Sequence, residues 1–517
     1  MAKYKPTNQS QGRFLPVFFN KQLQKGTFEF AVNHLVDNVL RLSHLDNRYQ
    51  NDDNGAPAYD PRILLKVILV AYSRGITSSR DIARCCEENV VFMALSAYSR
   101  PHFTTIANFV SGMDKEIIVL FREVLLACDE MGLIGREMFA VDGCKLSSNA
   151  AKEWSGTTDD FKKKCIKLEN AIERIVGRHR EDDLSEAENK VIETEKQYIA
   201  TLEKQVKKVR QWLDDNDDKR GHKGTPTKSN ITDNDSAKIK SSNGIIQGYN
   251  GVAMVDDKHQ IIVGAEAFGE ATEYNLLGPM IEVTRENFTA IGDQGDVFNE
   301  TKLTADSGFH TNKNMKMLAE EEIDAYIADR QFRKRDPRFD NAGRYKERTT
   351  EERRKIDKSR KQFHPADFTF DPDFKFCICP AGKRMYRSGI ATVKGVKRAA
   401  FTGQKRHCRP CKLRSQCLRY PDRTEIRQVT CAIGVVQENT PASFAEKMKS
   451  KIDSVMGKTI YARRIATAEP PFAHIRHVMG LDRFSLRSKN KVNNQWLLFC
   501  IVHNLKKIFK YGLASAI

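Results

Sequence analysis

The 517-residue sequence predicts a mixed α/β protein whose central sheet is interrupted by two insertions. Short apolar runs that end in an acid alternate with helical segments, which is typical of an α/β domain. Residues 161–213 have the regularly spaced apolar side chains of two packed helices, and residues 330–420 form a basic segment with clustered cysteines. The expected parts are a helical N-terminal domain at 1–130, an α/β domain assembled from 136–160, 232–329 and 440–517, a helical hairpin at 161–231 and a basic insertion at 330–439.

The N-terminal region contains short helices joined by tight turns. Pro61 opens the apolar run 63–72, and Gly75 separates that run from a segment beginning with potential N-cap residues at 77–79. This pattern fits a helix-turn-helix module that contacts DNA, and it fits an ordinary helical bundle equally well. The start of the chain lacks the apolar core of a signal peptide and no stretch approaches 18 apolar residues, so we expect a cytoplasmic protein without a membrane span.

An aspartate directly follows four apolar residues in the stretch 138–146. The run is short enough to be a buried strand, and Gly143 follows Asp142. A surface Asp-Gly turn is the simpler interpretation of this pair. On a buried strand, however, an unpaired carboxylate is costly, so Asp142 would need a cation, a metal ion or hydrogen-bond donors beside it.

Apolar side chains recur at alternating steps of three and four in residues 161–213. This is the spacing of the a and d positions of a coiled coil, and a break near 177–185 would let two helices form an antiparallel hairpin. The pattern leaves open whether the seam pairs within the chain or with a second subunit. The seam residues are Phe161, Cys165, Leu168, Ile172 and Ile175, then Ile199, Leu202, Val206, Val209 and Leu213.

The α/β pattern resumes after residue 244. A short strand at 302–305 ends in Asp306, with Gly308 two residues further on, and so resembles the stretch around Asp142. The other expected elements are a hairpin of strands at 245–255 and 261–265, helices at 275–286 and 311–322, and a strand at 325–328.

The basic character of the chain is concentrated in one segment. The formal net charge is +18, and residues 330–420 account for all of it because the remaining residues balance to zero. Such a charge indicates a polyanionic partner. The segment also contains cysteines spaced like the ligands of a zinc ribbon, with free thiols in a loop as the alternative. The predicted zinc ligands are Cys379, Cys408, Cys411 and Cys417, with Cys377 competing for the first place.

A third acid stands out near the C-terminus. Glu469 and Asp482 are the only acids in residues 463–517, against ten Lys and Arg. Glu469 follows a helix-compatible stretch and precedes Pro470, which restricts the backbone. An isolated acid in a basic setting is easier to explain as a metal ligand than as a solubilising charge.

Taken in order, Asp142, Asp306 and Glu469 resemble the catalytic triad of the DDE transposases of bacterial insertion sequences. The resemblance also rests on residues 142–145, 247–250, 305–309, 330–333, 496–498 and 503–506. One related signature contains Tyr, Arg, Glu and Lys in this order. Two residues separate Tyr from Arg, three separate Arg from Glu, and six separate Glu from Lys. Tyr461 and Arg464 match its start, whereas four residues separate Arg464 from Glu469 and Arg476 replaces the lysine.

The resemblance implies an RNase H-like catalytic fold, a helical transposase N-terminal domain and a cysteine-bearing insertion. It also implies cleavage of element ends and strand transfer, with Asp142, Asp306 and Glu469 binding two Mg²⁺ ions, or Mn²⁺ in their place. Double-stranded DNA and a second copy of the chain would be the partners. The expected DNA-binding residues are Tyr461, Arg464, Arg476, Arg333, Lys334 and Arg335. A metal-dependent nuclease without strand transfer and a catalytically inactive DNA-binding regulator are the alternatives.

Overall fold

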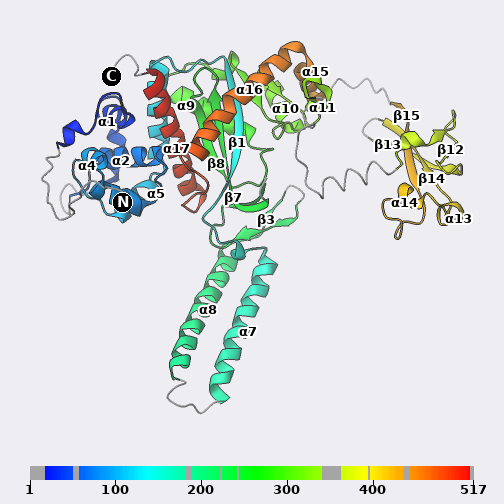
Figure 1. Cartoon of the computed structure of the whole chain (residues 1–517), viewed down its shortest axis with the longest axis horizontal. Coiled ribbons are helices and arrows are strands. Elements are labelled where there is room, and N and C mark those ends of the chain that lie inside the picture. Colours follow the sequence, from blue (N-terminus) through cyan, green and yellow to red (C-terminus); the bar gives the residue numbers. More distant parts are fainter. Residues whose placement is uncertain are drawn as a thin grey trace, which may run out of the picture. The chain divides into compact units, whose positions relative to one another are not determined.

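The computed structural model describes residues 18–49, 57–181, 189–221, 224–241, 244–339, 363–393, 396–435 and 443–512. The chain divides into two compact units, one formed by residues 1–330 and 448–517 and the other by residues 331–447. Helices and a sheet that mixes parallel with antiparallel strands make the protein a mixed α/β protein, as the sequence predicts (Figure 1). No helix in the described ranges is long and apolar enough to cross a membrane.

The sheet of the first unit has the strand order β10-β9-β1-β7-β6, and β8 also pairs with β7. β1 runs antiparallel to β7 and parallel to β9, and β9 runs parallel to β10. Residues 138–141 of β1 are fully buried, which explains the apolar run there. The strands are β1 (Met138–Ser147), β6 (Ala237–Ser241), β7 (Gly244–Asp256), β8 (Ile262–Phe268), β9 (Lys302–Ala305) and β10 (Ala325–Ile327).

The N-terminal region is helical. Its α2 begins at Pro61, and the Asp60 side chain caps it by accepting a hydrogen bond of 2.8 Å from the backbone N–H of Arg62. The helices are α1 (Phe28–Asn38), α2 (Pro61–Ser73), α3 (Ser79–Glu88), α4 (Val90–Leu95), α5 (Phe103–Ser111) and α6 (Glu116–Glu130). The sheet is accompanied by α9 (Leu277–Ala290), α10 (Asn312–Glu320), α15 (Phe444–Asp453), α16 (Val455–Ala473) and the π-helical turn η7 (His474–Val478).

Helix α17 (Lys489–Lys507) joins the N-terminal helices to the sheet. It packs against α2, α5 and α6 and also against β8 (Figure 1). The Asn504 amide accepts a hydrogen bond of 2.9 Å from Ile262 N–H and donates one of 2.9 Å to the Ile262 carbonyl, while Asn493 accepts one from Ala267 N–H. Since β8 pairs with β7 alone, α17 satisfies backbone groups on the open edge of the sheet.

Helices α7 (Thr158–Glu181) and α8 (Asn189–Asp215) form an antiparallel hairpin (Figure 1). Its buried cluster contains the predicted seam residues Phe161, Val206 and Val209, so the seam pairs within the chain. Trp212, which the predicted seam omits, packs edge-to-face on Phe161 with ring centroids 4.6 Å apart. Strand β2 (Ser155–Gly156) pairs with β5 (Ser229–Asn230) at the base of the hairpin, and β3 (Lys219–Arg220) pairs with β4 (Pro226–Thr227).

The second unit is built on a five-stranded antiparallel sheet with the order β11-β12-β13-β14-β15. Its core includes Phe368, Cys377 and Phe401. The strands are β11 (Thr369–Phe370), β12 (Phe376–Ile378), β13 (Arg384–Val393), β14 (Val396–Thr402) and β15 (Gln428–Val435), and the short helices are α11 (Phe332–Arg335), α13 (Lys405–Cys408) and α14 (Arg414–Cys417).

Candidate active site

The parallel pairing of β1 with β9 brings two of the predicted acids to the same edge of the sheet. Val141 of β1 pairs with Ala305 of β9, and Asp142 and Asp306 are the residues that directly follow this pair. Each aspartate accepts a local backbone hydrogen bond, Asp142 from Gly143 N–H at 2.8 Å and Asp306 from Gly308 N–H at 2.7 Å. Asp142 thus lies within β1 where its pairing with β9 stops, Asp306 directly follows β9, and both line the same cavity.

Asp142 is paired with an arginine from α16. Arg464 Nη1 lies 3.0 Å from Asp142 Oδ2, and the Arg464 side chain is only 9% exposed. Burial raises the pKa of Asp142 above its usual value, Arg464 opposes this rise, and the nearby Asp306 adds to it. Arg464 is therefore the cation that the sequence led us to expect beside the largely buried Asp142 carboxylate.

Asp142, Asp306 and Glu469 line one cavity of about 760 Å³. They are separated by 164 and 163 positions in the sequence, so the fold alone brings them together. Several other ionisable residues line the same cavity: Lys145, Lys240, Glu273, Arg476, His477 and Asp482. The cavity thus combines carboxylates with cationic side chains.

Glu469 reaches this cavity from α16, which continues through Pro470 and Pro471. Pro470 has no N–H to donate to the Ala466 carbonyl, and the Gln260 side chain donates to that carbonyl instead at 2.9 Å. Glu469 is exposed on the cavity wall. Across the described residues, no three His, Cys, Asp or Glu side chains are grouped closely enough to hold a metal ion.

The predicted DNA-binding residues divide between the two units. In the first unit, Arg476 lines the cavity, while Arg464 is buried against Asp142 and lies 5.8 Å from the Tyr461 ring centroid. In the second unit, Arg333 and Lys334 on α11 are exposed and Arg335 is half-buried.

Glu273 is a cavity residue that the sequence reasoning missed. It lies in the loop between β8 and α9, and Lys145 Nζ is 3.7 Å from its Oε1. Burial raises the pKa of Glu273, Lys145 opposes the rise, and Asp306 and Asp142 increase it. The surrounding sequence contains no strand-end signal like those of the two aspartates, so only the folded sheet reveals this neighbour.

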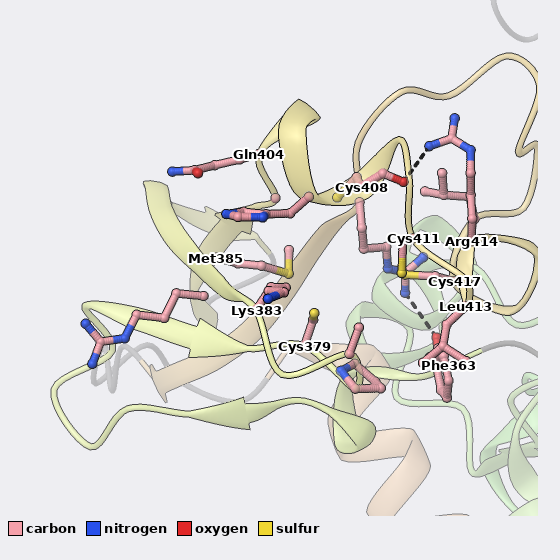
Figure 2. Close-up of a pocket in the computed structure, with 17 residues that line it drawn as sticks. Phe363, Cys379, Lys383, Met385, Gln404, Cys408, Cys411, Leu413, Arg414 and Cys417 are labelled. Atoms are coloured by element: carbon pink, nitrogen blue, oxygen red, sulfur yellow. Dashed lines mark hydrogen bonds between the residues drawn. The ribbon is translucent and has the colours of Figure 1, made fainter.

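Four cysteines of the second unit surround a small pocket of about 30 Å³ (Figure 2). They are the predicted zinc ligands Cys379, Cys408, Cys411 and Cys417. Burial raises the pKa of the Cys417 thiol, and the other three thiols raise it further. Cys377 lies instead in the core of the unit, where burial raises its pKa to about 11.

The polypeptide around this pocket is held by one arginine. Arg414 donates hydrogen bonds to four backbone carbonyls, those of Cys408, Pro421, Thr424 and Glu425. These bonds tie the segment that carries three of the cysteines to the turn that follows it. The pocket is therefore part of a defined local structure, and its thiols are soft ligands of the type that zinc prefers.

Comparison with known protein families gives two matches. A family model described as a transposase DDE domain matches residues 378–509, which include the four pocket cysteines and Glu469. A second model, described as a transposase domain (DUF772), matches residues 17–112, which include α1 to α5. No curated protein matches the chain.

Proposed function

We propose that this chain cleaves DNA at the ends of an insertion sequence and joins those ends to target DNA. The two family-model matches support the assignment to the DDE transposases of insertion sequences. The observation that carries the proposal is the shared cavity of Asp142, Asp306 and Glu469. A DNA-binding protein without catalysis has no use for carboxylates that face a bound phosphate, because like charges repel.

DDE transposases generally use a divalent metal ion, and the residues of this cavity fit Mg²⁺ in their chemistry. Asp142 and Asp306 supply oxygen ligands. Asp306 raises the pKa of Asp142, and both aspartates raise the pKa of Glu273, so a bound cation would relieve this repulsion. We propose that these two aspartates hold the ions and that Glu469 completes their coordination. When bound, two such ions would activate a water or a DNA 3′-hydroxyl and would stabilise the departing oxygen in an in-line displacement.

The cationic residues of the cavity have a separate role in this proposal. Lys145, Lys240 and Arg476 provide positive charge around the carboxylates and would hold the phosphates on either side of the scissile bond. Arg464 keeps Asp142 in place through its ion pair. Such phosphate contacts are independent of base sequence and make DNA affinity fall as salt rises.

The remaining parts of the proposal concern the architecture. We propose that the mixed sheet has the RNase H-like fold and that residues 61–110 recognise the element ends as the chain assembles into an oligomer on DNA. We also propose that the pocket of Cys379, Cys408, Cys411 and Cys417 holds a structural zinc ion, supported by the position of these four cysteines on the wall of one pocket.

The test is metal-dependent cleavage of DNA that carries the element ends. Asp142→Asn, Asp306→Asn and Glu469→Gln should each lower the cleavage rate by at least about a thousandfold, because each variant removes a charged metal ligand. Asp482→Asn is the matched control, since Asp482 lines the same cavity and is the other acid in the C-terminal segment. Full activity in all three variants would refute the mechanism, and loss in Asp482→Asn alone would reassign the third acid.

A second assay separates the transposase from a nuclease. Pre-cleaved element ends with free 3′-hydroxyls are incubated with circular target DNA and Mg²⁺. A transposase yields joined products from wild type and none from Asp142→Asn. Cleavage activity without any joined product would favour the nuclease.

A further inference from the structure

Glu273 lies between the two aspartates of the cavity. A Cβ atom added to Gly143, the residue after Asp142, would be 3.5 Å from Glu273 Oε1. A Cβ atom added to Gly308 would be 3.0 Å from Glu273 Oε2 and 2.9 Å from Asp306 Oδ1. One carboxylate oxygen of Glu273 therefore faces β1 beside Asp142, and the other faces the turn after Asp306.

The loop that carries Glu273 is anchored on both sides. The Asn250 amide donates a hydrogen bond of 2.6 Å to the Glu270 carbonyl, and the Asn314 amide donates one of 2.9 Å to the Tyr274 carbonyl. The Glu273 carbonyl accepts a further bond, from the backbone N–H of Leu276 at 3.1 Å. These bonds fix the backbone on each side of Glu273, so its carboxylate is preorganised at the cavity.

The charge at this place is unbalanced. Asp142 and Asp306 are both near enough to repel the charge of Glu273, and the Glu273 side chain is only 13% exposed. Lys145 is the cation paired with Glu273, at a distance beyond that of a good hydrogen bond, and Arg464 is paired with Asp142. In the ion pairs of the described residues, these three carboxylates thus have two cationic partners, and a bound divalent ion would offset the remaining negative charge.

We infer that Glu273 is a fourth carboxylate of the catalytic metal site, placed to bind the same divalent ions as Asp142 and Asp306. The inference rests on the proposed function. It differs from a purely structural role in which Glu273 only holds Lys145. A carboxylate that served Lys145 alone would need only Oε1, which lies 3.7 Å from the amine, whereas the second oxygen, Oε2, faces the turn after Asp306.

The two roles are separated by measuring Mn²⁺ binding to the full chain without DNA, by titration calorimetry. Glu273→Gln, which keeps the shape of the side chain, should weaken Mn²⁺ binding by about tenfold or more, as should Asp142→Asn. Glu270→Gln is the matched control, because Glu270 is an exposed acid in the same loop and should leave affinity unchanged. Lys145→Gln removes a competing cation, so its Mn²⁺ affinity should equal or exceed that of wild type.

The outcomes distinguish this inference from the proposed function. Weakened binding in Asp142→Asn with wild-type binding in Glu273→Gln would overturn the inference and leave the proposed function standing. Wild-type Mn²⁺ binding in both Asp142→Asn and Glu273→Gln would refute the proposed metal centre as well as the inference. A loss in Lys145→Gln equal to that in Glu273→Gln would show that the pair acts as a structural unit, and would also overturn the inference.

Discussion

Replacing Asn504 by leucine tests whether α17 holds the open edge of the sheet. The Asn504 side chain is fully buried, and its amide satisfies both the N–H and the carbonyl of Ile262. Leucine has a similar volume but no polar atoms, so both backbone groups would lose their partner inside the protein. A buried unsatisfied group costs about 1–3 kcal/mol, and two such groups, less the gain from burying an apolar side chain, amount to about 3 kcal/mol.

The assay is hydrogen–deuterium exchange of the peptide that covers β8. A loss of about 3 kcal/mol corresponds to a drop of about a hundredfold in the protection of the Ile262 amide, since each 1.4 kcal/mol is a factor of ten. Asn494→Leu is the control on the same helix. Asn494 is buried as well, but its amide nitrogen is 3.5 Å from the Val110 carbonyl, a distance at which a hydrogen bond is weak.

Equal protection of β8 in the Asn504→Leu and Asn494→Leu variants would refute the reasoning. That result would mean that apolar packing of α17, rather than its paired amides, holds β8 in place. A drop confined to Asn504→Leu would show that the amide fixes the edge strand and, through it, the loop that follows β8.

Three further predictions concern charge, metal and packing. Glu273→Gln should raise the free energy of unfolding of the metal-free protein by about 1 kcal/mol at pH 7, because burial raises the pKa of Glu273 and ionisation then costs free energy in the fold. That gain should vanish in urea titrations below about pH 4, where the glutamate is protonated in both the folded and the unfolded states. Cys408→Ser should abolish stoichiometric zinc in metal analysis of the purified protein, because Cys408 lines the pocket. Cys377→Ser should retain the zinc, because Cys377 lies in the core of the unit. Trp212→Ala should destabilise the hairpin by about 3–5 kcal/mol through loss of its contact with Phe161, measured as faster proteolysis within α7 and α8.

The sequence was most informative where one local rule decides the structure. Asp142 and Asp306 each follow a short apolar run, which predicted the two strands, whereas their proximity was implied by the family resemblance and follows from the parallel pairing of β1 with β9. Trp212 was missed because the a/d count selected Leu213, whereas the hairpin buries the larger ring against Phe161. Glu273 was missed because its position depends on how β8 pairs with β7 and on two asparagine anchors distant in sequence.

The cysteine assignment shows the same limit. Cys377 and Cys379 are two positions apart, so a continuous strand would point both to one face. β12 ends at Ile378, and a turn in which Gly382 N–H donates to the Cys379 carbonyl redirects Cys379 to the pocket. Spacing alone left the choice between the two thiols open, and the end of the strand decides which of them faces the pocket.

The pairing of β2 with β5 has a consequence for how the core assembles. Ser155 and Gly156 pair with Asn230 and Ser229, so the hairpin insertion closes on itself before the chain returns to β7. β1 and β7 then need to join across roughly 20 free residues instead of nearly 100, which lowers the entropic cost of loop closure by about 1.3 kcal/mol. A chain with β2 and β5 prevented from pairing should therefore fold more slowly, although every contact within the sheet itself is unchanged.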